Sequence, residues 1–425
     1  MKVTVPYGTG ILSVDIPEKN LLGVILPPDV PVKETEPAIR EALAQPIGSR
    51  RLREMVQAGQ KVVIIPTDIT RSLHEEIILP LLLEELNAAG VKDQDITLVI
   101  ATGTHRPNSR EECIAMYGQE VVDRIRIINH SAYDETRLKY LGKTPSRGIP
   151  VKVNQVVAEA DVKISTGVIE PHLFAGYSGG VKSIAVGVAG AETIAATHNV
   201  DILDDSRTRL GVIEGNVFRQ FLEEATGFVQ LDFIVNMVLN PKKECVKVVA
   251  GDPVAAHAEG VRVARQVYEV PVKQQADIVI AAPGYPKDVD LYQATRAVNT
   301  SVYGPKPLVK QNGVLIIPAA CPDGIGHEGY HAWMRTVNSA NEAVAKAKSE
   351  GFAPGEHKVF VLGRILQRAE LKIVGSAVPD ETLRDLLLTP VESMELALQQ
   401  AFAKLGSDAT VWVLPYGVIT IPVLD

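Results

Sequence analysis

The sequence predicts an α/β protein with two Rossmann-like α/β lobes, built on mostly parallel sheets, around an interdomain cleft. Short runs rich in Val and Ile recur along the whole chain and alternate with longer amphipathic stretches. The runs are apolar at every position, which is typical of parallel strands buried on both faces. Strands that alternate with helices indicate a doubly wound architecture. With 425 residues, and about one domain per 150 residues, two or three compact units are expected.

The first lobe is predicted from four apolar runs and the helical stretches between them. Strands are expected at 61–66, 96–101, 124–129 and 161–165. A helix at 77–89 ends at Gly90, and a helix capped by Ser109 ends at Gly118.

The second lobe repeats this pattern after residue 270. Strands are expected at 277–282, 313–318, 358–362 and 371–374, and helices at 291–298, 338–348 and 394–404. A helix at 253–268 ends in Val270-Pro271, which predicts a boundary there. We therefore expect an N-terminal domain at 1–270, to which a strand at 408–425 returns, and a C-terminal domain at 271–407 that closes the cleft.

Composition excludes several classes of partner. Forty-three Lys and Arg stand against 51 Asp and Glu, a net charge of −8, which argues against nucleic-acid and anionic-membrane binding. The three cysteines form no Cys-x-x-Cys pair, and no run approaches the ~18 apolar residues of a membrane helix. The chain has no signal-peptide pattern, so a reducing, cytoplasmic location is expected.

Three predicted strands are each followed directly by polar sequence that contains Gly or Pro, at 66–71, 101–106 and 165–172. Ligands bind outside the carboxyl ends of strands in open α/β sheets. If these strands are parallel neighbours, one crevice receives four polar side chains, those of Asp68, Arg71, His105 and His172. Each histidine, considered alone, is most simply a surface residue. The prediction of a shared crevice rests on three strands that all end in polar segments of this kind.

A glycine-rich loop with a lysine follows at 175–183. Its three glycines and its Ser are expected to expose backbone N–H groups that cradle an anion, with Lys182 adding a positive charge. Counted from Gly176 it nearly matches the phosphate-binding pattern G-x-x-x-x-G-K-[ST], but Val181 replaces the second glycine. A nucleotide triphosphatase is therefore disfavoured, and a merely flexible loop leaves the lysine unexplained.

A small-residue stretch at 184–197, helical from Ala191, leads to His198, which is either a metal ligand or a helix-end residue. The remaining histidines have no motif around them and are expected to be structural; they are His74, His130, His257, His327 and His331. Among them, His327 lies between glycines and is the best candidate for a site residue. Glu75, Glu76, Glu223 and Glu224 are expected on solvated helix faces.

Taken together, TDITR at 67–71, GTHR at 103–106, PHLFAGYSGGVK at 171–182 and TH at 197–198 resemble the lactate racemase family. These enzymes use a nickel-pincer nucleotide, a pyridinium-3,5-bisthiocarboxylic acid mononucleotide carrying Ni. The similarity runs over nearly the full chain, and it implies racemisation or epimerisation of a 2-hydroxy acid.

The resemblance implies a role for each matching residue. Lys182 matches the lysine that is attached covalently to the cofactor, and His198 matches the single protein ligand to nickel, a donor that suits Ni(II). His105 and His172 match the acid/base pair. The resemblance further implies two binding sets: Asp68, Thr70, Ser178, Gly179 and Gly180 at the cofactor, and Arg71, Tyr292, Gln293 and Arg296 at the substrate.

This reaction suits the predicted residues, because a C–H bond beside a hydroxyl loses hydride more readily than a proton. The cofactor accepts hydride, and histidines, which titrate near neutral pH, move the hydroxyl proton. The family usually has Lys where this chain has Arg296, so the preferred acid stays open between lactate and larger 2-hydroxy acids.

Partners implied by the resemblance are this small acid and the enzymes that build the cofactor. Two other functions stay open. One is a nucleotide- or metabolite-binding protein that uses the loop at 176–182 without chemistry. The other is a phosphate-handling enzyme with Asp68 on Mg²⁺.

Overall fold

The computed structural model describes residues 1–71, 73–352 and 355–424, and the chain forms two compact units. Unit 2 consists of Asp29–His198 and Ile213–Val267, and unit 1 of Met1–Pro28, Asn199–Val212 and Tyr268–Asp425. Each unit contains a central, mostly parallel sheet, which confirms the predicted fold class. Met1–Pro28 and Asn199–Val212 join the C-terminal residues, whereas the sequence assigned them to the N-terminal domain.

Unit 2 is built on a six-stranded sheet in the order β13-β12-β9-β4-β5-β6. Its strands are β4 (Val62–Ile65), β5 (Ile96–Ile100), β6 (Arg126–Asn129), β9 (Val162–Val168), β12 (Phe233–Leu239) and β13 (Cys245–Gly251). All neighbours pair in parallel except β12 with β13, which form an antiparallel pair. Every residue of β4, β9 and β12 is buried, as the uninterrupted apolar run predicted for β4; β9 is buried although it includes the polar residues Lys163, Ser165 and Thr166.

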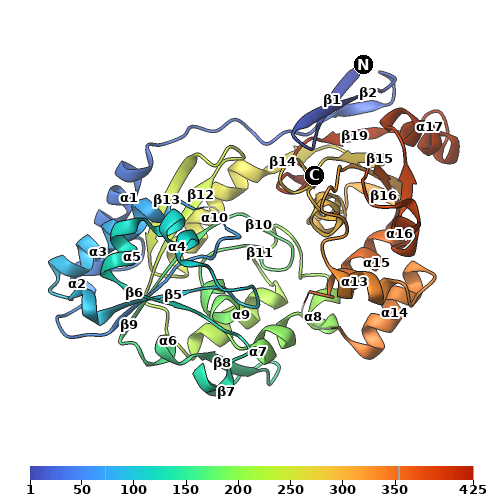
Figure 1. Cartoon of the computed structure of the whole chain (residues 1–425). Coiled ribbons are helices and arrows are strands. Elements are labelled where there is room, and N and C mark those ends of the chain that lie inside the picture. The colour runs from blue at the N-terminus through green and yellow to red at the C-terminus, as the bar shows by residue number, and fades with distance from the viewer. Residues whose placement is uncertain (72, 353–354, 425) are drawn as a thin grey trace. The chain divides into compact units, whose positions relative to one another are not determined.

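Helices cover this sheet. They are α1 (Thr35–Ala44), α2 (Leu52–Met55), α3 (Glu75–Ala88), α4 (Arg110–Tyr117), α5 (Gln119–Arg124), α6 (Gln155–Glu159), α7 (Ala191–Thr197), α9 (Val217–Gly227) and α10 (Ala255–Tyr268). Residues of α1 to α5 form one apolar core with the strands, and these helices gather outside the sheet in Figure 1. Ser109 caps α4, as predicted from the sequence, and the structure adds a capping box with Glu112.

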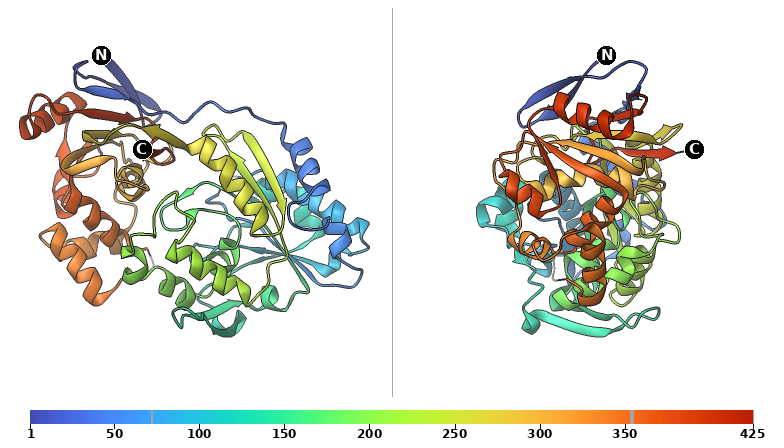
Figure 2. Two further views of the ribbon diagram at one scale, coloured as in Figure 1. Left: turned by 180° about the vertical axis from the view of Figure 1, so that it is seen from behind. Right: turned by 90° about the vertical axis from the view of Figure 1, so that its right-hand side faces the viewer.

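Short elements complete unit 2. They are the hairpin of β7 (Leu138–Lys143) and β8 (Pro150–Asn154), the small hairpin of β10 (Pro171–His172) and β11 (Gly176–Tyr177), the 3-10 turns η1 (Asp93–Asp95) and η2 (Glu135–Arg137), and the π-helical turn η3 (Ser183–Gly187). Figure 2 shows α10 lying along β12 and β13, where Gly260 lets the helix approach Ile169 and Val249 closely.

Unit 1 has an all-parallel six-stranded sheet in the order β18-β17-β16-β15-β19-β3. Its strands are β3 (Leu21–Val24), β15 (Ala276–Ala281), β16 (Val309–Pro318), β17 (Ala369–Val374), β18 (Thr389–Val391) and β19 (Val411–Leu414). Since β19 lies inside this sheet, the predicted return of 408–425 to the N-terminal domain is wrong. β20 (Ile421–Leu424) pairs with β14 (Glu269–Val272) in the same unit, and Asp425 lies outside the described residues.

The helices of unit 1 are α8 (Val200–Asp204), α11 (Leu291–Ala294), the 3-10 turn η4 (Thr295–Val298), α12 (Asn299–Tyr303), α13 (Glu328–Met334), α14 (Ala340–Glu350), α15 (Lys358–Arg368), α16 (Asp380–Asp385) and α17 (Met394–Leu405). The strand predicted at 358–362 is wrong, because these residues begin α15. An apolar run this short fits a buried strand and a buried helix equally well. In α15 all five residues of the run are buried, so no alternation between buried and exposed positions distinguishes a strand from a helix.

The N-terminal hairpin of β1 (Lys2–Tyr7) and β2 (Gly10–Asp15) belongs to the core of unit 1. Its buried Val3, Val5 and Val14 pack with residues of β15, β16, β19 and α17. This long-range packing explains why the first residues of the chain join its C-terminal half.

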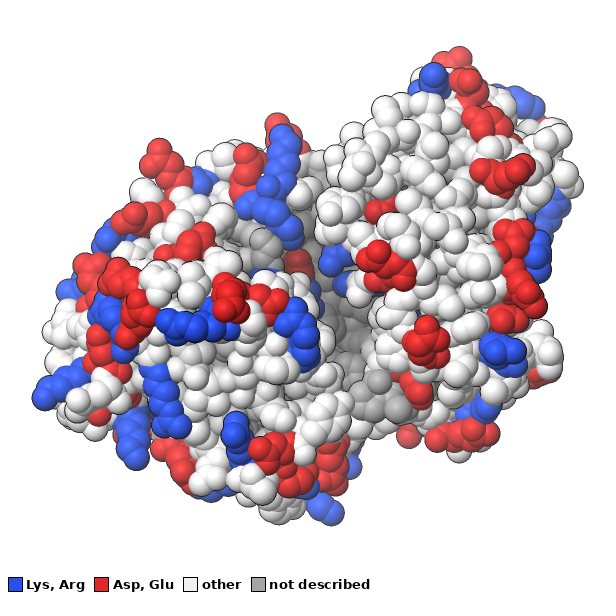
Figure 3. Space-filling view, in the orientation of Figure 1, with Lys and Arg blue, Asp and Glu red and all other residues white. Residues whose placement is uncertain are grey.

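The surface carries interspersed charges. On the face drawn in Figure 3, acidic and basic side chains alternate over both units. Many form exposed ion pairs, such as Arg40 with Glu36 and Arg110 with Asp123. All three cysteines are buried and free. Within 1–71, 73–352 and 355–424, no helix has the length and apolar character needed to cross a membrane.

One acidic side chain of α3 departs from the predicted solvated face. Glu76 and Glu223 are exposed, and Glu224 is partly exposed, but Glu75 is fully buried. Its carboxyl group accepts hydrogen bonds from the Thr166 hydroxyl at 2.5 Å and from the Thr67 backbone N–H at 3.2 Å. Burial raises the pKa of Glu75 to about 7, so the protonated form is favoured in the folded protein.

We predict that Glu75→Gln changes the pH dependence of stability. Because the folded-state pKa of Glu75 lies above its unfolded value of 4.5, the folded protein binds the extra proton, and stability falls as pH rises from 4.5 to about 7. The neutral amide avoids this loss, which is on the order of 3 kcal/mol. Urea unfolding at several pH values should show that the free energy of unfolding of the variant, relative to that of the wild type, increases as pH rises to about 7. Glu76→Gln is the exposed control, and a difference independent of pH would contradict the prediction.

Candidate active site

Three polar loops meet at one edge of the unit 2 sheet. β9, β4 and β5 are adjacent and parallel, so their carboxyl ends lie together, as the sequence predicted. A further bridge between Thr67 and Ala101 holds the first two loops to each other. The loops after these strands carry Asp68, His105 and His172.

Asp68 and His105 form a hydrogen-bonded pair. Nδ1 of His105 lies 2.6 Å from Oδ2 of Asp68, whose residue is only 3% exposed, while the His105 side chain is 56% exposed. Thr70 donates its hydroxyl to Asp68 Oδ1 at 2.6 Å. Burial alone would raise the pKa of Asp68, but the hydrogen bonds from His105 and Thr70 lower it below its ordinary value. The ionised carboxylate can only accept, so Nδ1 of His105 carries the proton and its Nε2 is basic.

Arg71 forms an ion pair with Glu170, which follows β9. The sequence predictions included Arg71 but not Glu170, although Glu170 lies within the 165–172 segment. Ser178 ties this segment to the glycine-rich loop, because its hydroxyl donates to the Val168 carbonyl at 2.6 Å and accepts from the Glu170 N–H at 3.1 Å. The guanidinium of Arg71 is thereby positioned by a carboxylate from the neighbouring loop.

His172 has the opposite tautomer from His105. Its Nδ1 accepts hydrogen bonds from the backbone N–H groups of Phe174 at 3.3 Å and Ala175 at 3.1 Å. In the neutral ring the proton is therefore on Nε2. One histidine of the predicted acid/base pair thus has a basic Nε2, and the other has an Nε2–H that can donate.

His172 and His198 share one aromatic cluster with Phe174 and Phe218. The His198 ring lies 5.1 Å from Phe218 and 5.8 Å from Phe174, and the His172 ring lies 6.2 and 6.3 Å from the same two rings, between centroids. Neither phenylalanine was predicted as a site residue, since single aromatic residues are ordinary in cores. These rings place both histidines in an apolar environment.

His198 ends α7 with its ring held in one orientation. Nδ1 lies 3.0 Å from the Ile194 carbonyl and 2.7 Å from the Thr197 hydroxyl, so Nδ1 is the protonated nitrogen and Nε2 carries the lone pair. Burial lowers the pKa of His198 to about 4, which favours the neutral, metal-binding ring. The described residues contain no group of three or more His, Cys, Asp or Glu able to share a metal ion.

The glycine-rich loop is folded against the protein, and this corrects the prediction of an open anion cradle. The Ser178 N–H donates to the Glu170 carbonyl at 2.9 Å, and the Gly180 N–H donates to Asn236 Oδ1 at 2.8 Å. Nε2 of His257 lies 2.9 Å from the Ser178 carbonyl. The donors that such a cradle would need are thus already occupied at two positions.

The glycines are required by close contacts as well as by conformation. Gly179 and Gly180 have φ values of 79° and 57°. A Cβ at Gly179 would lie 2.8 Å from Asn236 Oδ1, and one at Gly180 would lie 2.8 Å from the His257 ring. His257 is therefore structural, as predicted. It contacts the glycine-rich loop that leads to Lys182 and holds it in place.

Lys182 lies directly after this loop, at the start of η3. Burial lowers the pKa of Lys182 to about 7, and the positive charge of Arg71 acts in the same direction, while Glu170 and Asp68 oppose it. These charges show that Lys182 is electrostatically coupled to the residues at the strand ends. Near neutral pH much of its amine is unprotonated and therefore nucleophilic.

The other predicted histidines have local partners. His130 is buried and bonds the Ala189 carbonyl at 2.9 Å, His74 pairs with Glu76, and His331 pairs with Asp385. His327 differs, because it caps α13 and its ring stacks on Tyr292 at 5.4 Å.

Tyr292, Gln293 and Arg296 lie on α11 and η4 of unit 1. Arg296 donates to Gln293 Oε1 at 2.9 Å, and the Tyr292 hydroxyl donates to the Gly355 carbonyl at 3.0 Å. The sequence missed a fourth member of this group, Lys358, whose Nζ lies 5.4 Å from the Tyr292 ring centroid. Burial lowers the pKa of Lys358 to about 7, with Arg296 adding to the effect. No local motif marks Lys358, since the helix it begins was predicted as a strand.

Comparisons with known proteins agree over nearly the whole chain. A family model described as the lactate racemase N-terminal domain matches residues 7–211, and one described as the lactate racemase C-terminal domain matches residues 272–422. The lactate racemase of Thermoanaerobacterium thermosaccharolyticum is 31% identical over 426 residues, covering 99% of this chain and 98% of that protein. The lactate racemase of Lactiplantibacillus plantarum is 30% identical over 423 residues, covering 98% of each.

Solved structures give the same result. The lactate racemase apoprotein from T. thermosaccharolyticum superposes with a TM-score of 0.90 at 30% identity, covering 100% of both chains. A protein from Thermotoga maritima has a TM-score of 0.70 at 19% identity, covering 92% of this chain and 98% of that one, and this is a likeness of fold alone. Two matching domain models and full-length relatives at about 30% identity show that this chain belongs to the lactate racemase family of isomerases.

Proposed function

We propose that this protein racemises or epimerises a 2-hydroxy acid, either lactate or a larger relative. The observation that carries the proposal is the pair of histidines in opposite tautomers, His105 with a basic Nε2 and His172 with an Nε2–H. Inverting a carbon that bears a hydroxyl group requires a proton acceptor and a proton donor that exchange roles between the two enantiomers. A protein that only bound a metabolite would have no need of the Asp68 carboxylate, which fixes one of these tautomers.

The cofactor that we propose is the nickel-pincer nucleotide, and the residues of unit 2 suit it. His198 offers one neutral imidazole nitrogen, which fits a nickel ion whose other ligands belong to the cofactor. Lys182 offers a partly unprotonated amine for covalent attachment. Asp68, Thr70 and the loop of Ser178, Gly179 and Gly180 would surround the attached group. When bound, the cofactor supplies an acceptor for hydride.

The chain's own residues would bind the acid and move its proton. We assign the substrate carboxylate to Arg71, whose planar guanidinium suits two parallel hydrogen bonds and which would then exchange or share its contact with Glu170. His105 takes the hydroxyl proton from one enantiomer as its C–H bond breaks, leaving a planar 2-keto acid. After the keto acid turns its other face, His172 donates the proton that restores the hydroxyl group. The opposite direction uses the same two residues in reverse.

Tyr292, Gln293 and Arg296 are proposed as substrate residues on the basis of the family resemblance. Arg296 is held by Gln293, so the two act as one hydrogen-bonding unit. The nearby Lys358 adds a second basic group, whose charged form is disfavoured by burial and by Arg296. A second carboxylate on the acid would favour the charged form of Lys358, which is why larger 2-hydroxy acids belong in any substrate screen.

We predict that Lys182 is the attachment site. Protein produced together with the cofactor-building enzymes should show added intact mass at Lys182 and bound nickel, and Lys182→Arg should lose both. Lys358→Arg is a matched control, because burial also lowers the pKa of Lys358 to about 7. It should keep the added mass. An active preparation with no modification at Lys182 would contradict the proposed mechanism.

A second prediction separates the two histidines. His105→Ala and His172→Ala should each lower racemisation by roughly 10²–10⁴-fold, which is the usual contribution of a general acid or base. Added mass at Lys182 should be unchanged in both. In single-turnover experiments each variant should lose keto acid formation from one enantiomer far more than from the other. His74→Ala is the control, and unchanged turnover in either active-site variant would refute the assignment.

A third prediction concerns the residue that orients His105. Asp68→Asn replaces the acceptor of the Nδ1 proton with an amide that can also donate, so the productive tautomer is no longer enforced. We expect kcat to fall by roughly 10²-fold or more, with KM for the acid changed much less. Thr70→Val removes one hydrogen bond to the same carboxylate, a loss of about 1 kcal/mol, and should reduce kcat by only about fivefold. Equal effects of the two substitutions would show that Asp68 acts only through local packing.

A further inference from the structure

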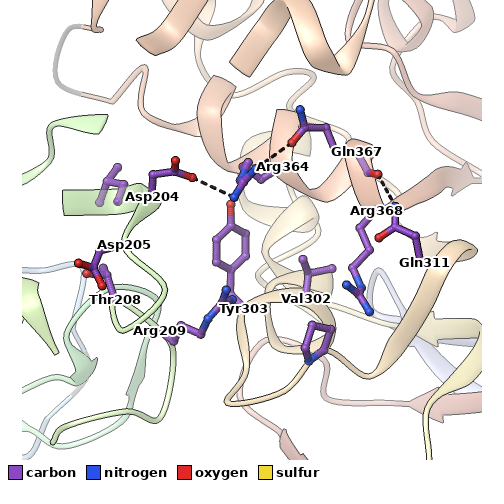
Figure 4. Close-up of a pocket in the computed structure, with 12 residues that line it drawn as sticks. Asp204, Asp205, Thr208, Arg209, Val302, Tyr303, Gln311, Arg364, Gln367 and Arg368 are labelled. Atoms are coloured by element: carbon purple, nitrogen blue, oxygen red, sulfur yellow. Dashed lines mark hydrogen bonds and ion pairs between the residues drawn. The ribbon is translucent and has the colours of Figure 1, made fainter. Parts of the chain in front are cut away.

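A cavity of about 290 Å³ lies within unit 1, separate from every residue assigned above. It is bounded by α8 and the loop that follows it, by α12, and by one side of α15 (Figure 4). Its volume is near the lower end of the range for small-molecule sites, about 300–1,000 Å³. The lining is mostly polar, and three of its side chains are the arginines Arg209, Arg364 and Arg368.

The acidic side chains of the cavity already have cationic partners. Asp204 pairs with Arg364 at 3.0 Å and also with Lys348, and Asp205 pairs with Arg207 at 2.8 Å. Of the three arginines that line the cavity, only Arg364 is paired with one of these two carboxylates, that of Asp204.

Among the described residues, Arg209 and Arg368 have no carboxylate partner. The Nε–H of Arg209 donates to the Ser206 carbonyl at 2.9 Å, and that of Arg368 donates to the Val309 carbonyl at 2.8 Å. Across the part of the chain that the structure describes, neither side chain has a carboxylate within 4 Å, and their terminal guanidinium nitrogens make no further hydrogen bond. In Figure 4 the two lie on opposite sides of Tyr303.

The two guanidiniums also repel each other. Burial lowers the pKa of Arg368 below its ordinary value, and the charge of Arg209 contributes in the same direction. Two like charges held around a shared cavity cost free energy unless an anion lies between them. An unused hydroxyl is available as well, since Thr208 lines the cavity, is 1% exposed, and has no hydrogen-bond partner for its Oγ1 among the described residues.

We propose that this cavity binds a small oxyanion, the phosphate or carboxylate group of a metabolite, between Arg209 and Arg368, with Thr208 as a further contact. The terminal N–H groups of each arginine would form the paired hydrogen bonds that such groups accept. The occupant would link the loop after α8 to α12 and α15, three segments that are distant in sequence. The site is independent of the proposed racemase reaction, and its residues are not part of that machinery.

Binding is tested on the full-length protein with inorganic phosphate and with malonate as probes. Calorimetry and thermal unfolding are measured at constant ionic strength, with sodium chloride as the reference salt. We expect each probe that binds to raise the unfolding temperature with a saturating dependence on its concentration. Tighter binding of phosphate would identify a phosphorylated ligand, and tighter binding of malonate would identify a carboxylate, and either result supports the site.

The variants locate the binding. Arg209→Gln and Arg368→Gln should each weaken the probes at least tenfold, and Arg368→Lys, which keeps the charge, should weaken them less. Arg207→Gln is the matched control, since Arg207 is adjacent in sequence and paired with Asp205 but does not line the cavity. Circular dichroism verifies folding, and Arg368→Lys keeps the test valid if a Gln variant does not fold. Probes that bind no better than chloride, or that bind the Gln variants as tightly as the wild type, would overturn the proposal.

Discussion

The site of unit 2 depends on the parallel pairing of β9, β4 and β5. Strands β4 and β9 are buried on both faces, and the polar loops that carry the site residues begin where these strands end. Parallel pairing brings all three carboxyl ends to one edge. The loops that carry Asp68, His105 and His172 therefore begin at the same edge of the sheet, although their segments are far apart in the chain, and Asp68 and His105 are in direct contact.

Burial then sets the chemistry of the side chains at this edge. The same loss of water that favours a neutral Lys182 and a neutral His198 would also favour a protonated Asp68. Hydrogen bonds from His105 and Thr70 reverse the effect at Asp68 only, so an anion persists beside neutral bases. The glycine-rich loop serves this arrangement by positioning Lys182, and it is itself held by Asn236 and His257 from distant parts of unit 2.

Opposite tautomers of two histidines follow from different local partners. A carboxylate accepts from Nδ1 of His105, whereas backbone N–H groups donate to Nδ1 of His172. The proposed roles of acid and base rest on the surroundings of each ring, since the two side chains are chemically identical. A reaction that inverts one carbon in both directions needs this complementarity.

The sequence by itself determined the strands β4, β5, β6, β9, β15, β16 and β17, several helix ends and the identity of the polar residues that follow the strands of the site, because buried runs, caps and glycine stops are local signals. It also carried the motifs that place the chain in its family. Only the tertiary structure decided which distant groups meet. It buried Glu75 against Thr166, brought the N-terminal hairpin into the core of unit 1, and made a helix of 358–362. It also occupied the N–H groups of the glycine-rich loop and left Arg209 and Arg368 without carboxylate partners among the described residues. These outcomes depend on packing between segments far apart in the chain, which no local pattern of residues encodes.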